Sequence, residues 1–191
     1  DDYFDMELAF VNTSRDDSLE YTVFDAPLLN DGNSITYEDF GIQIDIISHM
    51  ENVRIESRIS PAEKIYKGFL EEFVLLPLRP EKEATQNRPG IIIKLSGLSS
   101  EKDGIYGIFL GQKTPDTFQI NGDLYFTEFR RKRTYLPFSI SLLDFEKIMH
   151  PGTNVAKSYS SEVNLIENSI PRRILIQMNE PLRHQNYTFY Q

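Results

Sequence analysis

The three histidines are the side chains best suited to bind a metal or to transfer a proton near neutral pH. His49, His150 and His184 lie 101 and 34 positions apart, and no His-x-x-x-His pair occurs. The chain has no cysteine, so thiolate ligands, thiol nucleophiles and disulfides are excluded. The spacing therefore predicts no metal site built from neighbouring ligands, and each histidine is equally compatible with a turn or strand end that binds nothing.

Carboxylates are the other candidates for acid–base chemistry. Glu71 and Glu72 are adjacent, which on a strand would point them to opposite faces. Asp144 and Glu146 share a face but have no evident partner in the sequence. No Gly-x-Ser-x-Gly motif occurs, and the spaced glycines of residues 104–111 lack the lysine of a phosphate-binding loop. We identify no catalytic residue and interpret the chain as a non-enzyme.

Basic residues cluster late in a chain whose net charge is −9. Residues 1–51 contain thirteen acids and one base, a balance that argues against binding to nucleic acid. A cationic face for a partner is predicted from four arginines, which are Arg130, Arg131, Arg133 and Arg183. Because consecutive side chains alternate on a strand, the run 130–133 cannot all face one way. A solvated strand and loop, which protects a sheet edge from pairing, is the alternative.

The elements that must position these residues are strands. Apolar and polar residues alternate over 42–47, 138–142 and 187–189, the pattern of a half-buried strand. Residues 91–93 and 105–110 are continuously apolar and predict strands buried on both faces. Asn121-Gly122 between two such segments is the strongest hairpin signal. A short helix is expected within Pro61 to Glu72, although a strand reading competes from Gly68 onward.

This pattern predicts a mainly β fold, either an antiparallel β-sandwich or two similar packed β-modules with few short helices. The modules would span about residues 1–122 and 123–191 of one domain, because strands near 42 and 138 begin similar series. Near the C-terminus, we expect the strand Ile174 to Met178 to pair with Tyr187 to Gln191. Leu182 and Phe189 are expected in the core.

Length and composition suit a folded chain without a membrane span. The 191 residues are 40% hydrophobic and 12% aromatic, which excludes a disordered chain. A spanning helix needs about 20 apolar residues, and no such run occurs, nor does a signal peptide. The acidic start and the strand-like end suggest a piece excised from a larger protein.

The last third of the chain has a series of short motifs in a fixed order. They are an apolar strand from Leu136, Pro151-Gly152-Thr153, Lys157-Ser158-Tyr159, Asn179-Glu180-Pro181-Leu182 and Phe189-Tyr190-Gln191. In this order and spacing they resemble the extracytoplasmic domain of ResB-like proteins, which are membrane proteins of System II cytochrome c maturation. The resemblance is clearest from Asp123 to Gln191 and fainter over Phe40 to Ile55.

The resemblance implies a role in assembly. ResB-like proteins act with a ResC/CcsA-type haem-handling membrane protein and present haem to apocytochrome c, whose Cys-x-x-Cys-His thiols bond to the haem vinyl groups. It implies a bacterial chain on the periplasmic side of the inner membrane, anchored by segments outside this sequence. Haem would belong to the full assembly rather than to this fragment. His184 and His150, and less so His49, become candidates for haem contact, and the four arginines become a face for its propionates.

Two other classes of function remain open. A cell-surface β-sandwich that binds glycan or protein through exposed aromatic residues is the first alternative, and Tyr187, Phe189 and Tyr190 would be candidates for that surface. A hydrolase with an unrecognised carboxylate pair is the second. The gene neighbourhood and any flanking hydrophobic segments would separate the ResB-like function from a cell-surface module. Turnover of a substrate would establish the hydrolase.

Overall fold

The computed structural model describes residues 5–13 and 21–191 and is mainly β, with 55% strand and 6% helix. The predicted fold class is therefore confirmed. The chain divides into two compact units, Asp1–Arg133 and Thr134–Gln191. The division follows strand β10 (Asp123–Arg131), because β10 pairs along most of its length with β1 (Met6–Asn12) and so belongs to the first unit.

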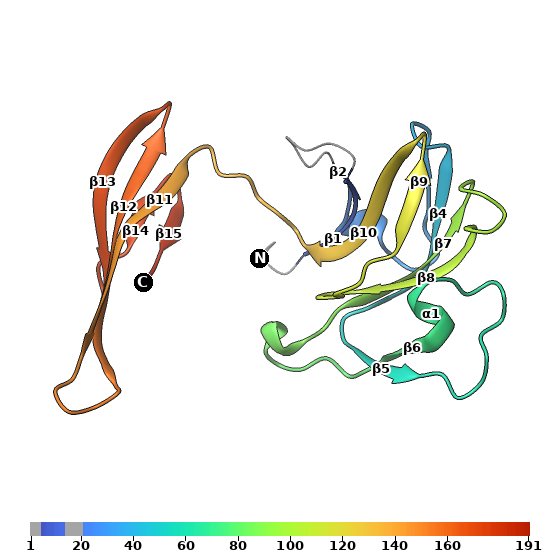
Figure 1. Ribbon diagram of the computed structural model, residues 1–191, viewed down its shortest axis with the longest axis horizontal. Coiled ribbons are helices and arrows are strands. Elements are labelled where there is room, and N and C mark those ends of the chain that lie inside the picture. The colour runs from blue at the N-terminus through green and yellow to red at the C-terminus, as the bar shows by residue number, and fades with distance from the viewer. Residues whose placement is uncertain (1–4, 14–20) are drawn as a thin grey trace. The chain divides into compact units, whose positions relative to one another are not determined.

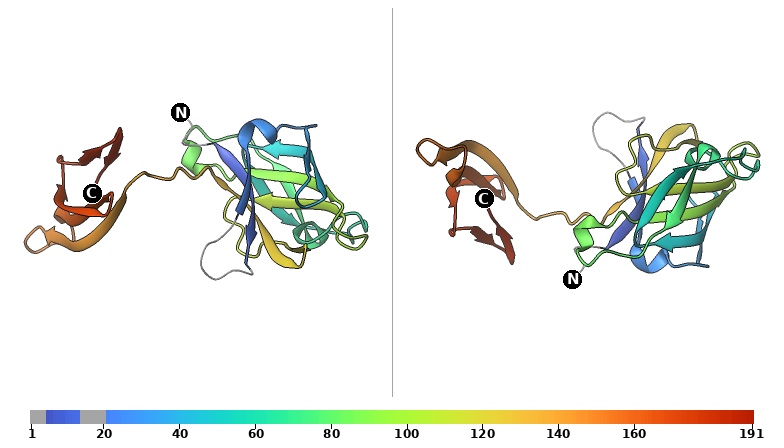
Figure 2. Two further views of the ribbon diagram at one scale, coloured as in Figure 1. Left: turned by 90° about the horizontal axis from the view of Figure 1, so that it is seen from above. Right: turned by 90° about the horizontal axis from the view of Figure 1, so that it is seen from below.

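The first unit contains two antiparallel four-stranded sheets (Figures 1 and 2). One sheet has the order β2-β1-β10-β9, and the other has the order β3-β4-β7-β8. The further strands are β2 (Tyr21–Asp25), β3 (Ser34–Tyr37), β4 (Ile42–Met50), β7 (Gly90–Ser96), β8 (Gly104–Phe109) and β9 (Thr117–Ile120). Short 3₁₀ turns at Ala26–Leu28 and Ala84–Gln86 connect strands of this unit.

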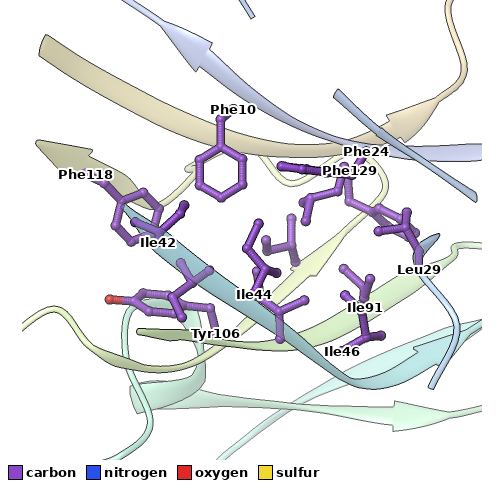
Figure 3. Close-up of a cluster of buried hydrophobic side chains, with 14 of the residues drawn as sticks. Phe10, Phe24, Leu29, Ile42, Ile44, Ile46, Ile91, Tyr106, Phe118 and Phe129 are labelled. Carbon is purple, nitrogen blue, oxygen red and sulfur yellow. The ribbon is translucent and has the colours of Figure 1, made fainter. Parts of the chain in front are cut away.

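The core of the first unit lies between these sheets. Phe10 on β1 and Phe118 on β9 face Ile42 and Ile44 on β4 across the layer (Figure 3). Phe10 is fully buried, with edge-on contacts to the rings of Phe24 at 6.1 Å and of Phe40. Along β4, buried residues alternate with more exposed ones over Ile42–Ile46, as the period-two pattern predicts. The two sheets with the core between them form a β-sandwich.

A third layer covers the outer face of the β3-β4-β7-β8 sheet (Figure 1). It consists of the hairpin β5 (Val53–Ser57) and β6 (Phe73–Pro77) with helix α1 (Phe69–Glu72). Ile92 and Phe109 pack on this layer, whereas Ile91 and Ile108 pack in the sandwich core. The prediction that these two apolar runs are strands buried on both faces is confirmed.

Two local predictions of the sequence, a hairpin and a short helix, are confirmed. Asn121 and Gly122, at φ 53° and 91°, join β9 to β10 in the hairpin expected there, since a type I′ turn needs positive φ at both positions. The short helix expected within Pro61 to Glu72 is the single turn of α1. Gly68, at φ 55°, is its N-cap, and the extended backbone of Phe73 ends it.

The second unit is a three-stranded antiparallel sheet with a small hairpin. The sheet has the order β11-β12-β13, and its strands are β11 (Ser139–Met149), β12 (Ala156–Glu167) and β13 (Ile170–Gln177). The hairpin is β14 (Leu182–His184) with β15 (Tyr187–Phe189), drawn in dark red near the C-terminus in Figure 2. Its residues Leu182 and Phe189 pack with Val163 and Ile176 of the sheet.

The predicted pairing of Ile174–Met178 with Tyr187–Gln191 is wrong. β13 pairs with β12, and β15 pairs with β14. The reason is a second tight turn: Gln185 and Asn186 have φ of 46° and 67°, which closes a two-residue hairpin directly after Leu182–His184. Leu182 is nevertheless buried and Phe189 partly buried against the same cluster, as expected.

Candidate functional site

Arg130 lies in a buried ion-pair network on the first unit. Its Nε donates to Glu7 Oε1 at 2.7 Å and its Nη1 donates to Glu128 Oε2 at 2.7 Å. The side chains of Arg130 and Glu7 are only 7% and 5% exposed, and the two residues face each other across β1 and β10. Burial by itself would lower the pKa of Arg130, but the hydrogen bonds that it donates to Glu7 and Glu128 raise it. The guanidinium charge is thus balanced inside the unit.

The neighbouring basic residues have different partners and different exposure, because consecutive side chains on a strand face opposite sides. Arg131 Nη2 donates to the carbonyl oxygen of Ala84 at 3.4 Å. Arg133 lies beyond the end of β10, half exposed, with Nη2 3.6 Å from Glu128 Oε2. Arg183 lies on β14 of the second unit, exposed and opposite Thr188. The three arginines of the first unit therefore differ in burial and in partners.

His49 and Arg131 line one pocket of about 270 Å³ in the first unit. The His49 ring contacts Phe129 edge-on at 5.7 Å. Burial lowers the pKa of His49, against the opposing effect of Asp31 and Glu51, so its imidazole is neutral near pH 7. The pocket thus offers an uncharged imidazole beside a guanidinium group, and it joins two residues that the sequence treated separately.

His184 lies inside the second unit. Its ring packs edge-on against buried Phe138 at 4.7 Å. Its Nε2 atom is buried without a hydrogen-bond partner, 3.5 Å from Glu167 Oε2, and the imidazole is 16% exposed. The other oxygen of Glu167 accepts a hydrogen bond from Gln185. Nε2 is therefore shielded from solvent.

His150 lies in an exposed turn of the second unit. Its backbone N–H donates to Val155 at 2.9 Å and its carbonyl accepts from Thr153 at 3.1 Å. These bonds close the loop between β11 and β12 around Gly152, at φ 72°. The imidazole itself is exposed to solvent, so the turn is held by backbone groups rather than by the side chain.

Sequence reasoning missed a larger pocket of about 630 Å³ in the first unit, with Asp116 and Gly68 in its lining. These two residues are far apart in the chain, and neither belongs to a recognisable motif. The sequence therefore contains no indication that they line one pocket. Among the described residues, 5–13 and 21–191, no group of three or more His, Asp or Glu side chains is placed to hold a metal ion.

Comparison with known proteins shows a match between part of the chain and a family model. In the part of the chain that the structure describes, no helix is long and apolar enough to cross a membrane. No curated protein sequence matches the chain. The model of the ResB-like family matches residues 106–191, from β8 to the C-terminal residue. The resemblance seen in the sequence is therefore confirmed: from residue 106 onward, through the whole second unit, this chain carries the sequence pattern of the ResB-like family.

Proposed function

We propose that this chain is the extracytoplasmic part of a membrane-anchored cytochrome c biogenesis protein and helps to present haem to apocytochrome c. The observation that carries the proposal is the family match over residues 106–191, which includes the entire second unit. ResB-like proteins form a family of biogenesis and assembly proteins. The partners proposed from this family are a ResC/CcsA-type haem-handling membrane protein and apocytochrome c, on the periplasmic side of a bacterial inner membrane.

The residue types of the chain support a role in holding or guiding haem rather than in forming the thioether bonds. A chain without cysteine supplies no thiol, so the thioether bonds would form between haem and the cytochrome's own cysteines. The pocket of His49 and Arg131, at about 270 Å³, lies just below the 300 to 1,000 Å³ typical of ligand pockets. Its volume suits an edge of haem better than the whole macrocycle, and Arg131 would be the residue to face a propionate in a lining that also includes Asp5 and Glu51.

Maturation of a c-type cytochrome in cells tests the proposal. Loss of the intact gene is expected to abolish covalent haem attachment to a reporter cytochrome, measured by haem staining of denaturing gels. The intact gene should restore it. A folded variant with the double change His49→Ala and Arg131→Ala is expected to lower the yield of holocytochrome. Normal attachment in cells that lack the gene would sink the proposal.

The purified chain is expected to bind haem weakly. His184 Nε2 is buried beside Glu167 and His150 lies on an exposed turn, so neither forms a preformed axial site. Titration followed by absorbance should give no sharp Soret band at one-to-one stoichiometry. A sharp band that is lost in His184→Ala, but kept in His150→Ala, would instead identify His184 as an iron ligand.

Exposed aromatic side chains on the second unit favour one alternative function. Tyr135, Phe145 and Tyr190 are 70%, 50% and 77% exposed, and such rings bind sugars or partner proteins through their faces. A cell-surface module would bind immobilised glycans or a protein ligand without affecting cytochrome c. Saturable glycan binding that Phe145→Ser and Tyr190→Ser abolish, together with unchanged cytochrome maturation, would favour this function.

A further inference from the structure

The pocket of about 630 Å³ in the first unit has an aromatic floor and a wall formed by the segment 111–116. Phe69 and Phe73 stack with ring centroids 4.7 Å apart, and Phe109 lies 5.1 Å from Phe69. The wall opposite α1 is the segment 111–116, which connects β8 to β9. The contact between segment 111–116 and α1 determines how much of the aromatic floor is covered.

Asp116 is the residue that joins the wall to α1. Its carboxyl group lies directly over Gly68, where an added Cβ would be 1.8 Å from Asp116 Oδ1. It also accepts a hydrogen bond from the backbone N–H of Phe69. Gly68 has φ of 55°, which other L-residues rarely adopt. The contact therefore requires glycine at position 68.

The second oxygen of this carboxyl group has no partner. Asp116 Oδ2 is buried without a hydrogen bond, and so is Thr127 Oγ1. The backbone N–H of Thr127 donates to the backbone carbonyl of Asp116. A buried ionised oxygen without a donor is far more costly than a neutral one. Burial raises the pKa of Asp116 to about 6, although the hydrogen bond from Phe69 favours the charged form.

Charged groups around the contact act in both directions. Lys102, in the segment before β8, lowers the pKa of Asp116, and Glu71 on α1 raises it. The pKa of Tyr106 on β8 is raised by burial and by the charge of Asp116. The pocket rim adds Glu72, Arg88 and Lys113, all exposed. Burial of the Asp116 carboxyl group is thus the largest influence on its pKa.

We propose that Asp116 is a proton-binding site that latches segment 111–116 onto α1, and that loss of its proton releases the segment and opens the pocket. Gly111 is a natural pivot, with φ of 82° and no atom within 4 Å of an added Cβ. The backbone carbonyl of Asp116 accepts a hydrogen bond from the Thr127 N–H, so the backbone at this end of the segment stays on β10 while the Asp116 side chain leaves Gly68. This device is independent of the function proposed above and would regulate access to the aromatic floor.

The sign of the effect follows from linkage. In the open state Asp116 is solvated and titrates near the ordinary value of about 3.9, whereas in the closed state it titrates at about 6. The closed state binds the proton more tightly, so it is favoured at low pH and weakened as pH rises through this range. The closed-to-open ratio is expected to fall about tenfold between pH 5 and pH 7.5.

Nuclear magnetic resonance on the whole chain tests the latch. The Asp116 carboxyl signal is expected to titrate with a midpoint of about 6, and the amide signals of Gly68, Phe69 and Lys113 should shift with the same midpoint. The hydrogen-exchange protection factor of the Phe69 amide, corrected for intrinsic rates, should fall about tenfold from pH 5 to pH 7.5. The core amide of Ile91 should not follow this change.

Three variants separate the latch from simpler explanations. Asp116→Asn, neutral and of the same shape, should keep the Phe69 amide protected at every pH. Gly68→Ala should leave it unprotected at every pH because its Cβ overlaps the carboxyl group. Glu72→Gln, in the same pocket, should titrate like the wild type. A midpoint near 4 for Asp116, or a midpoint near 6 with unchanged Phe69 protection, would overturn the proposal, even if Asp116→Asn failed to fold.

Discussion

Arg130→Met is expected to destabilise the first unit by about 3 to 5 kcal/mol, because it leaves the Glu7 carboxylate buried without its partner. Chemical denaturation of the whole chain, followed through amide signals of the first unit, measures the loss. Arg133→Met is the matched control. It removes a half-exposed cation at 3.6 Å from Glu128, and exposed pairs contribute about 0 to 1 kcal/mol.

The double variant Glu7→Leu with Arg130→Met sharpens this test. Replacing both members of a buried ion pair with apolar groups is often close to neutral, so the double variant should recover most of the stability that Arg130→Met loses. If Arg130→Met leaves the free energy of unfolding unchanged but stops cytochrome c maturation, Arg130 acts on a partner or on haem rather than within the fold.

Phe189→Ala is expected to destabilise the second unit by about 3 kcal/mol. Phe189 lies opposite Leu182 in the C-terminal hairpin, and its ring contacts Phe138 edge-on at 6.0 Å. Among the described residues, the buried members of the cluster it joins are Val163, Ile176 and Leu182. A small unit with so small a core has little stability to lose, so thermal unfolding of this unit should shift to markedly lower temperature.

His150→Ala is the control for the second unit. The turn at His150 is closed by its backbone N–H and carbonyl groups, which alanine keeps, so the melting temperature should change little. If Phe189→Ala instead leaves stability unchanged and abolishes cytochrome c maturation, the ring belongs to a binding surface. The packing role assigned to it would then be wrong.

Features that depend on neighbouring residues could be predicted from the amino-acid sequence. Alternation with period two identified the strands, and Asn121-Gly122 identified a hairpin, because side-chain direction and positive φ are local properties. The order of motifs after Asp123 indicated a resemblance to the ResB-like family, whose model matches residues 106–191. The hairpin turn at Gln185-Asn186 was missed, because only Asn186 is a residue that commonly adopts positive φ.

The tertiary structure decided which distant residues meet. Whether Arg130 faced solvent or Glu7 depended on the pairing of β1 with β10, since both outcomes fit the same alternating strand. The meeting of His49 with Arg131, and of Gly68 with Asp116, likewise required sheets and loops far apart in the chain to come together. Burial, which sets the pKa of Asp116 and the cost of removing Arg130, arises only from that packing.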